Sequence, residues 1–265
     1  AALAEAGALI HATLNNPRAS ANIIGVNAGS GLFVLLFACV APHALGVSAA
    51  AAFLGALASA LLVFFVSAYA GASRLTIVLA GMALTAIFTA GMNTVLIFNP
   101  DAYVNSSGFL VGSLSGVMVS ELAIPGIMIC AGLILAMGQG TRLNILSLGD
   151  EGAHALGLNV NCTRLALLSL AALLAGAAVC FSGLIGFVGL IVPHVVRYVA
   201  GHDNRRVLVL SPIVGAILVC ACDTIARTLF APFEIPVGIC MALVGGPFFI
   251  YLILRSRKGE VDGRA

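Results

Sequence analysis

Apolar runs long enough to cross a membrane recur along almost the whole chain, and they constrain its fold more than any other feature. A transmembrane helix needs ~20 predominantly apolar residues, with a range of ~17–25. The 265-residue chain is 61% hydrophobic and only 8% charged, whereas a soluble domain carries roughly 25% charged residues. We therefore expect an all-α fold, a polytopic membrane helix bundle.

Polar breaks divide the apolar sequence into nine predicted helices, the first of which reads as already under way at the first residue. These segments cover residues 1–14, 27–42, 48–70, 75–98, 117–138, 164–182, 185–200, 207–227 and 236–254. We expect a single transmembrane domain over residues 1–256, followed by a cytoplasmic tail over 257–265.

The basic residues fix the orientation of the predicted bundle. Of the 12 basic residues, Arg227 alone lies on one side of the membrane in this helix scheme. The loops of the other side hold Arg18, Arg74, Arg142, Arg164, Arg197, Arg205, Arg206, Arg255, Arg257, Lys258 and Arg264. Short loops rich in arginine and lysine stay in the cytoplasm, so we expect this side and the C-terminus to be cytoplasmic.

Several functional classes lack their sequence signatures. The chain contains neither the HExxH motif of a metalloprotease nor the GxxxxGK[ST] phosphate-binding loop. Its seven cysteines are mostly single residues in apolar runs, where they act as small hydrophobic side chains. The net charge of +2 does not suggest nucleic acid as a partner. We expect no catalytic residues, no metal site and no cofactor.

Two polar stretches each allow two interpretations. Asp150 and Glu151 lie in a long inner connection, at the predicted start of a short helix, where the helix dipole favours negative charge. This connection is either a cytoplasmic docking helix or a solvated loop. On the outer side, Asp223 and Arg227 stand four residues apart and can pair, close to Glu234. This pair either anchors the helix end or contacts an external partner.

Four motifs, in order and at similar spacing, resemble one family over residues 1 to about 256. They are NNPRASANIIGVNAG, LSLGDEGAHALGL, GFVGLIVPHVVRYVAGHDNRR and DTIARTLFAPFEIPVGICMALVGGPFFIYLI. The chain is similar to the FecCD-type permease subunits of ABC importers for ferric siderophores, haem and vitamin B12. That family usually has ten helices, so the resemblance implies that the first helix is missing here. It also makes Pro193 and His194 part of a helix break.

The resemblance implies a transport subunit of a bacterial inner membrane, with ATP hydrolysed by other subunits. The implied partners are two ABC ATPase subunits, a second permease subunit (identical or paralogous), a periplasmic or lipid-anchored binding protein, and membrane lipid. A ferric siderophore is the expected substrate, with haem or cobalamin as alternatives. A stand-alone secondary transporter is the competing interpretation. It needs an intramembrane ionisable residue, for which Asp223 is the candidate.

The resemblance also assigns roles to individual residues. The ATPase-coupling loop comprises Leu148, Gly149, Asp150, Glu151, Leu156 and Gly157. The binding protein docks at Arg227 and Glu234. The inner gate includes Asn16 and Pro17, although Arg18 departs there from the usual aliphatic residue. The translocation pathway is lined by segment 75–98 through Met82, Thr85, Thr89, Met92 and Asn93, which recur at helical spacing and form either this pathway or ordinary helix packing. No ladder of acidic or histidine side chains is evident, which favours a complexed substrate over a bare ion.

Overall fold

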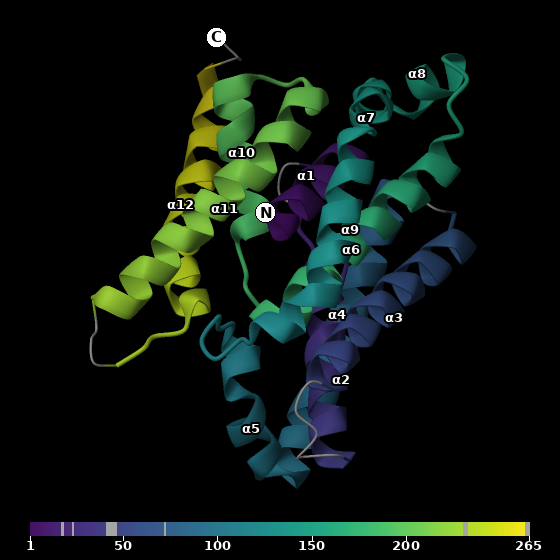
Figure 1. Ribbon diagram of the computed structural model, residues 1–265. Coiled ribbons are helices and arrows are strands. Elements are labelled where there is room, and N and C mark those ends of the chain that lie inside the picture. The colour runs from purple at the N-terminus through teal and green to yellow at the C-terminus, as the bar shows by residue number, and fades with distance from the viewer. Residues whose placement is uncertain (17–18, 23, 41–46, 72, 230–232, 263–265) are drawn as a thin grey trace.

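A computed structural model describes residues 1–16, 19–22, 24–40, 47–71, 73–229 and 233–262. Within these ranges the chain forms twelve α-helices and one short 3-10 helix, and no strand (Figure 1). The elements are α1 (Ala2–Leu14), α2 (Val26–Val40), α3 (Val47–Tyr69), α4 (Arg74–Phe98), α5 (Pro100–Val111), η1 (Val119–Leu122), α6 (Ala123–Met137), α7 (Gly140–Ser147), α8 (Asp150–Ala155), α9 (Val160–Ser182), α10 (Val188–Ala200), α11 (Asn204–Thr228) and α12 (Val237–Asp262).

The all-α helix bundle expected from the sequence is confirmed, whereas the number of membrane crossings stays a prediction. Among the described helices, α3, α4, α9 and α11 are long and apolar enough to span a membrane singly. The α6–α7 pair passes the same criterion only as one span bent by 53°. The helices α1, α2, α10 and α12 contribute shorter apolar stretches. The described part of the chain thus has the helices of a multi-pass membrane protein.

Helix α1 forms the centre of the bundle. It packs against α9, α10 and α11, and its residues from Ala4 to Leu14 are all buried. The small residues of α1 permit close backbone approach, which drives helix association in membranes where apolar burial does not. At the closest point, a Cβ atom on Gly7 would lie 1.9 Å from the carbonyl oxygen of Gly189 on α10. Only glycine is therefore compatible with this contact.

Helix α10 corrects the helix break that was expected at Pro193 and His194. The helix runs without interruption from Val188 to Ala200, and the chain turns earlier, where Gly183 and Phe187 have φ of 69° and 66°. Proline removes the hydrogen bond to the carbonyl four residues before it, which here is that of Gly189. This carbonyl lies against Gly7 of α1. The close packing between α1 and α10 supports the helix at this point, so α10 continues through Pro193.

The two ends of the bundle differ in character (Figure 1). Helices α7 and α8 lie at the same end as the last turns of α12, and α5 lies at the opposite end. Arg74 and Arg164 contact Asp150 at the first end, and Arg205 contacts Thr141 of α7 there. Helix α12 continues to Asp262, so it extends through most of the predicted tail.

Candidate functional site

The helix α8 is held against the bundle by a three-residue ion cluster. Arg164 of α9 donates from Nη2 to both carboxylate oxygens of Asp150, at 2.9 and 3.0 Å. Arg74, the first residue of α4, donates to Asp150 Oδ1 at 2.7 Å. One carboxylate on α8 therefore joins two helices of the membrane domain.

Burial makes this cluster more than a surface ion pair. The side chain of Arg164 is only 3% exposed, whereas that of Asp150 is 49% exposed. Breaking a buried ion pair by removing one partner is strongly destabilising, so the Asp150 carboxylate also stabilises the Arg164 guanidinium. Partial desolvation opposes ionisation of Asp150, but the Arg164 and Arg74 guanidinium groups outweigh it and lower the carboxyl pKa. The carboxylate and its ion pairs therefore persist at neutral pH.

The preceding helix, α7, is attached to the loop between α10 and α11. Asn144 donates from Nδ2 to Asp203 Oδ1 at 2.8 Å and accepts at Oδ1 from both the backbone N–H and Nδ2 of Asn204, at 2.9 Å each. Hydrogen bonds from Asn144 and from the Arg205 backbone lower the pKa of Asp203. The α7–α8 unit thus has fixed contacts to α4, α9 and α11.

Exposed apolar side chains flank α8 on both sides, each next to a glycine turn. Leu148 and Leu156 are 65% and 62% exposed, and Glu151 is exposed beside them. Gly149 and Gly157 adopt φ of 94° and 78°, a region that favours glycine, and they bound the short helix. The six residues of the predicted coupling loop thus form one protruding unit (Figure 1), with Asp150 directed inward and the leucines left open.

The five predicted pathway residues lie within an arc of about 100° around α4, and the two at one edge of that arc contact neighbouring segments. Thr85 donates to the carbonyl of Asn22 at 3.3 Å, and Met92 packs so closely on α2 that a Cβ atom on Gly31 would lie 2.6 Å from its sulfur. Met82, Thr89 and Asn93 are exposed instead. Their spacing places these three on a common side of the helix. The packing interpretation therefore fits Thr85 and Met92, and an open face remains for the other three.

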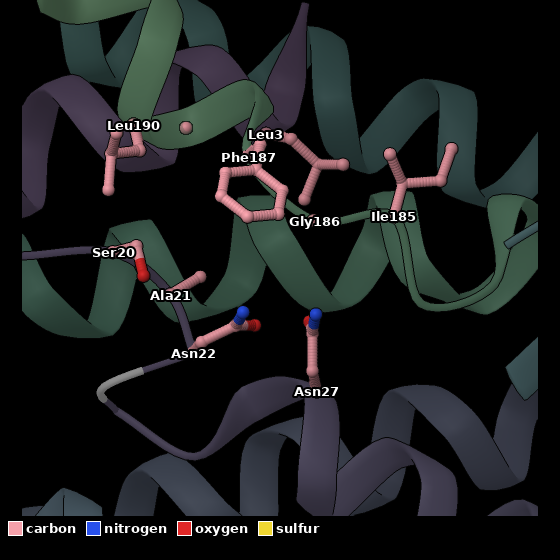
Figure 2. Close-up of a pocket in the computed structure, with 10 residues that line it drawn as sticks. Leu3, Ser20, Ala21, Asn22, Asn27, Ile185, Gly186, Phe187 and Leu190 are labelled. Atoms are coloured by element: carbon pink, nitrogen blue, oxygen red, sulfur yellow. The ribbon is translucent and has the colours of Figure 1, made fainter. Parts of the chain in front are cut away.

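A small cavity lies between α1, residues 20–22, the start of α2 and the segment that leads into α10 (Figure 2). Asn22 and Asn27 point toward it from one side, and Phe187 faces them from the other. Its volume is about 90 Å³, whereas sites for small-molecule ligands hold about 300–1,000 Å³. The cavity is too small to hold a metal chelate.

At the opposite end of the bundle, the predicted docking residues have separate partners. Arg227 pairs with Asp223 through Nε at 2.9 Å, as the four-residue spacing predicted. Glu234 accepts a hydrogen bond from Ser115, which joins the start of α12 to the loop after α5. Among the described residues, Arg227 and Glu234 form no salt bridge with each other.

Two polar side chains of α1 were missed by sequence reasoning. Glu5 and His11 are 0% and 2% exposed, although no acidic or histidine ladder was expected in the bundle. The sequence could have indicated them, because a glutamate and a histidine interrupt an otherwise apolar helix. Asn16, from the predicted inner gate, lines a cavity of about 400 Å³ together with His11 and Arg197. Pro17, the other predicted gate residue, lies outside the described residues.

The described residues contain no cluster of three or more histidine, cysteine or acidic side chains that fits a metal ion. Their cysteines are free thiols distributed over several helices. The candidate functional residues at the two ends of the helix bundle form ion pairs and hydrogen bonds.

Comparison with known proteins gives consistent matches over nearly the whole chain. The model of the FecCD transport family matches residues 1–255. The Hemin transport system permease protein HmuU of Yersinia pestis is 38% identical over 97% of this chain and 79% of its own length. The Fe(3+)-citrate import system permease protein YfmD of Bacillus subtilis is 37% identical, over 98% and 77%.

A solved structure supports the same assignment. It is described as an inward-facing conformation of a putative metal-chelate type ABC transporter, and it superposes with a TM-score of 0.88 at 29% identity. The alignment covers 96% of this chain and 82% of that one.

The ion cluster predicts how α8 responds to loss of one charge. Asp150→Asn removes both ion pairs, so hydrogen exchange of the amides in residues 148–158 should accelerate. Glu151→Gln is the matched control, because it removes a negative charge from the same first turn of α8. None of the described ion pairs or side-chain hydrogen bonds involves Glu151. Hydrogen–deuterium exchange with mass spectrometry checks both variants. Equal exchange in the two would contradict a specific role of Asp150.

Proposed function

Because the chain belongs to the FecCD transport family, we propose that it is the membrane permease subunit of an ATP-driven importer of an iron chelate. Relatives that transport hemin and Fe(3+)-citrate are almost equally similar to it. A ferric siderophore-type chelate is the proposed substrate, and haem or cobalamin are the alternatives within the same class. The proposed location is a bacterial inner membrane with the α7–α8 end and the C-terminus in the cytoplasm, as the arginine distribution favours.

The observation that carries this proposal is the construction of the α7–α8 end. A short helix that carries an exposed glutamate and is flanked by two exposed leucines projects from the bundle, while Asp150 fixes its base to α4 and α9. Exposed apolar side chains ringed by polar ones are typical of protein contacts. We propose that a partner ATPase subunit docks on Leu148, Glu151 and Leu156. Its movement then reaches α4 through the Asp150–Arg74 ion pair.

The exposed face of α4 is the proposed pathway, completed by a second permease subunit. In α4, 22% of the most apolar stretch is buried within the chain, compared with 67% in α9. Met82, Thr89 and Asn93 would line the route with weakly polar groups, which let a bulky chelate pass without tight binding. Thr85 and Met92 lie at one edge of this face and hold it through their contacts with Asn22 and Gly31.

A pair of threonines on α4 tests the pathway. Thr89 and Thr94 are both exposed, and each donates to the carbonyl four residues earlier, at 2.7 and 2.9 Å. They lie about 140° apart around the helix. Thr89→Trp should obstruct the route, and a barrier of about 1.4 kcal/mol already slows a step roughly tenfold. Thr94→Trp should have little effect.

The measurement is ATP-dependent uptake by the complete importer in proteoliposomes, with ferric citrate, haemin and cyanocobalamin as separate probes. Uptake of one probe that falls at least tenfold in Thr89→Trp, and not in Thr94→Trp, supports the proposal. Similar uptake in both variants would show that this face does not line the route. Uptake driven by an ion gradient without ATP would instead favour a secondary transporter. Such a transporter would use Asp223, which is held in the salt bridge with Arg227.

The opposite end is the proposed docking surface for an extracytoplasmic binding protein. Arg227 is 42% exposed despite its salt bridge, and Asp223 is 24% exposed, so the guanidinium retains open donors for a carboxylate of the partner. Glu234 lies in the same end of the bundle and is exposed. Its hydrogen bond with Ser115 fixes the loop that would surround the contact.

Two neutral substitutions separate docking from helix anchoring. Arg227→Gln and Asp223→Asn both abolish the internal salt bridge, but only the first removes the docking cation. An exposed ion pair contributes about 0.2–1 kcal/mol, so Arg227→Gln should raise the Kd for the binding protein by a factor of roughly 1.4 to 5. Asp223→Asn should leave the Kd unchanged or lower it. Surface plasmon resonance on the reconstituted complex measures both values. Equal effects of the two variants would assign Arg227 to anchoring only.

A further inference from the structure

The cavity of about 90 Å³ lies where two non-helical connections meet inside the bundle (Figure 2). Residues 20–22, between α1 and α2, line one side, and residues 185–187, between α9 and α10, line another. Non-helical backbone at membrane depth is tolerated only where protein buries it or where it lines a water-filled cavity. Many transporters contact their substrates at such interruptions of their helices. The position of this cavity therefore suits a contact with a transported molecule.

The first connection folds back into the bundle after the end of α1. Leu3, near the start of α1, lines the same cavity as residues 20–22, although α1 ends at Leu14. An α-helix rises about 1.5 Å per residue, so Leu3 and Leu14 lie about 16 Å apart along the helix axis. The chain has thus returned along most of α1 when it reaches residues 20–22, and the cavity lies within the bundle.

Two asparagine amides supply hydrogen-bond donors to this cavity. Asn22 and Asn27 both point toward it, and in the described part of the chain neither amide nitrogen donates to a protein atom. The Oδ1 atom of Asn27 is buried, which leaves its amide nitrogen to face the cavity. No acidic side chain is among the described lining residues. Since each amide nitrogen carries two N–H donors, the cavity suits an oxygen that accepts hydrogen bonds.

Phe187 forms an apolar wall opposite the two asparagines (Figure 2). Its φ of 66° lies in the left-handed region, which is unfavourable for a bulky residue and persists only where the surrounding structure fixes it. The ring packs against α12, where a Cβ atom on Gly245 would lie 2.3 Å from Cγ of Phe187. Backbone strain of this kind is concentrated at ligand sites. Here it holds an aromatic ring across from two amide donors.

The cavity adjoins the proposed pathway through α4. The carbonyl of Asn22 accepts a hydrogen bond from Thr85 at 3.3 Å, and Thr85 lies at the edge of the α4 face proposed as the pathway. The Asn22 side chain is exposed, so a molecule outside this chain can contact it. A cavity needs only about 10–15 Å³ to hold one water molecule. The volume of about 90 Å³ therefore accommodates one oxygen-bearing substituent of a chelate, although not the whole chelate.

We propose that this cavity is a polar subsite of the pathway, at which Asn22 and Asn27 donate hydrogen bonds to an oxygen of the passing chelate. The oxygen belongs to a carboxylate or an amide carbonyl at the edge of the chelate, and the metal centre stays outside the cavity, beside α4. This inference rests on the proposed function. It adds that the permease itself favours chelates with acceptor oxygens on their periphery.

Two substitutions of Asn22 separate recognition from structure. Asn22→Leu removes the donor, and loss of a neutral hydrogen bond should weaken chelate binding roughly 2- to 10-fold. Asn22→Asp keeps the shape of the side chain but replaces the donor with a carboxylate, which only accepts. Because this carboxylate repels the oxygen of the chelate, Asn22→Asp should weaken binding more than Asn22→Leu does. A structural role would give the opposite order, since aspartate matches asparagine in shape.

The same pair of substitutions at Asn27 repeats the test, and the pair at Asn161 is the matched control. Asn161 is an exposed asparagine in the first turn of α9 and does not line the cavity. The Kd of ferric citrate, haemin or cyanocobalamin, each used separately, is measured by isothermal titration calorimetry. The sample is the complete permease–ATPase complex in lipid nanodiscs, and empty nanodiscs give the background. If an Asn27 variant does not fold, as judged by circular dichroism, the Asn22 pair decides.

A Kd for one probe that rises more in Asn22→Asp than in Asn22→Leu, and is unchanged in both Asn161 variants, supports the subsite. Equal Kd values in all variants, no binding to the unmodified complex, or a smaller effect of Asn22→Asp than of Asn22→Leu each overturn it. ATP-dependent uptake of the same probe that persists alongside such a result leaves the proposed transport function intact. Absence of uptake of all three probes overturns the transport function and the subsite together.

Discussion

The ion cluster of Asp150, Arg164 and Arg74 is the interaction on which the position of α8, and with it the proposed coupling, depends. Arg164 is buried and its carboxylate partner lies on α8, so separating the two would break the ion pair of a buried guanidinium. The cost of that separation gives α8 a defined position on the bundle. The same carboxylate contacts the first residue of α4. A displacement of α8 is therefore a displacement of the base of the proposed pathway helix.

Packing within the bundle creates a contrast that suits a transporter. Helix α1 is buried among α9, α10 and α11, with backbone contact at Gly7 and Gly189. Helix α4 lies at the edge and buries little of its surface within the chain. A dense core resists deformation, whereas a helix with few internal contacts is free to take a partner on its open face. A rigid centre and an exposed α4 agree with a transport pathway that runs between α4 and a second permease subunit.

The sequence predicted the long apolar helices well because a run of about 20 apolar residues has few alternatives to a membrane helix. It missed α5 and α7 as helices because both are short and contain many polar residues. The Asp150 cluster joins residues 14 and 76 positions apart, which no local pattern encodes. The expected break at Pro193 was wrong because the helix is supported by packing against Gly7, a residue far away in the chain. The pathway residues share one arc of α4 as the spacing predicted, but the sequence did not indicate that Thr85 and Met92, at its edge, contact Asn22 and Gly31.

The central claim is that Asp150 transmits ATP-driven movement from α8 to α4. The most direct measurement is the number of chelate molecules imported per ATP hydrolysed by the reconstituted importer, compared between the unmodified complex, Asp150→Asn and the control Arg206→Gln, which removes an exposed arginine of the same end. We expect Asp150→Asn to continue hydrolysing ATP but to import fewer molecules for each one, while Arg206→Gln keeps the original ratio. An unchanged ratio in Asp150→Asn would contradict transmission through Asp150.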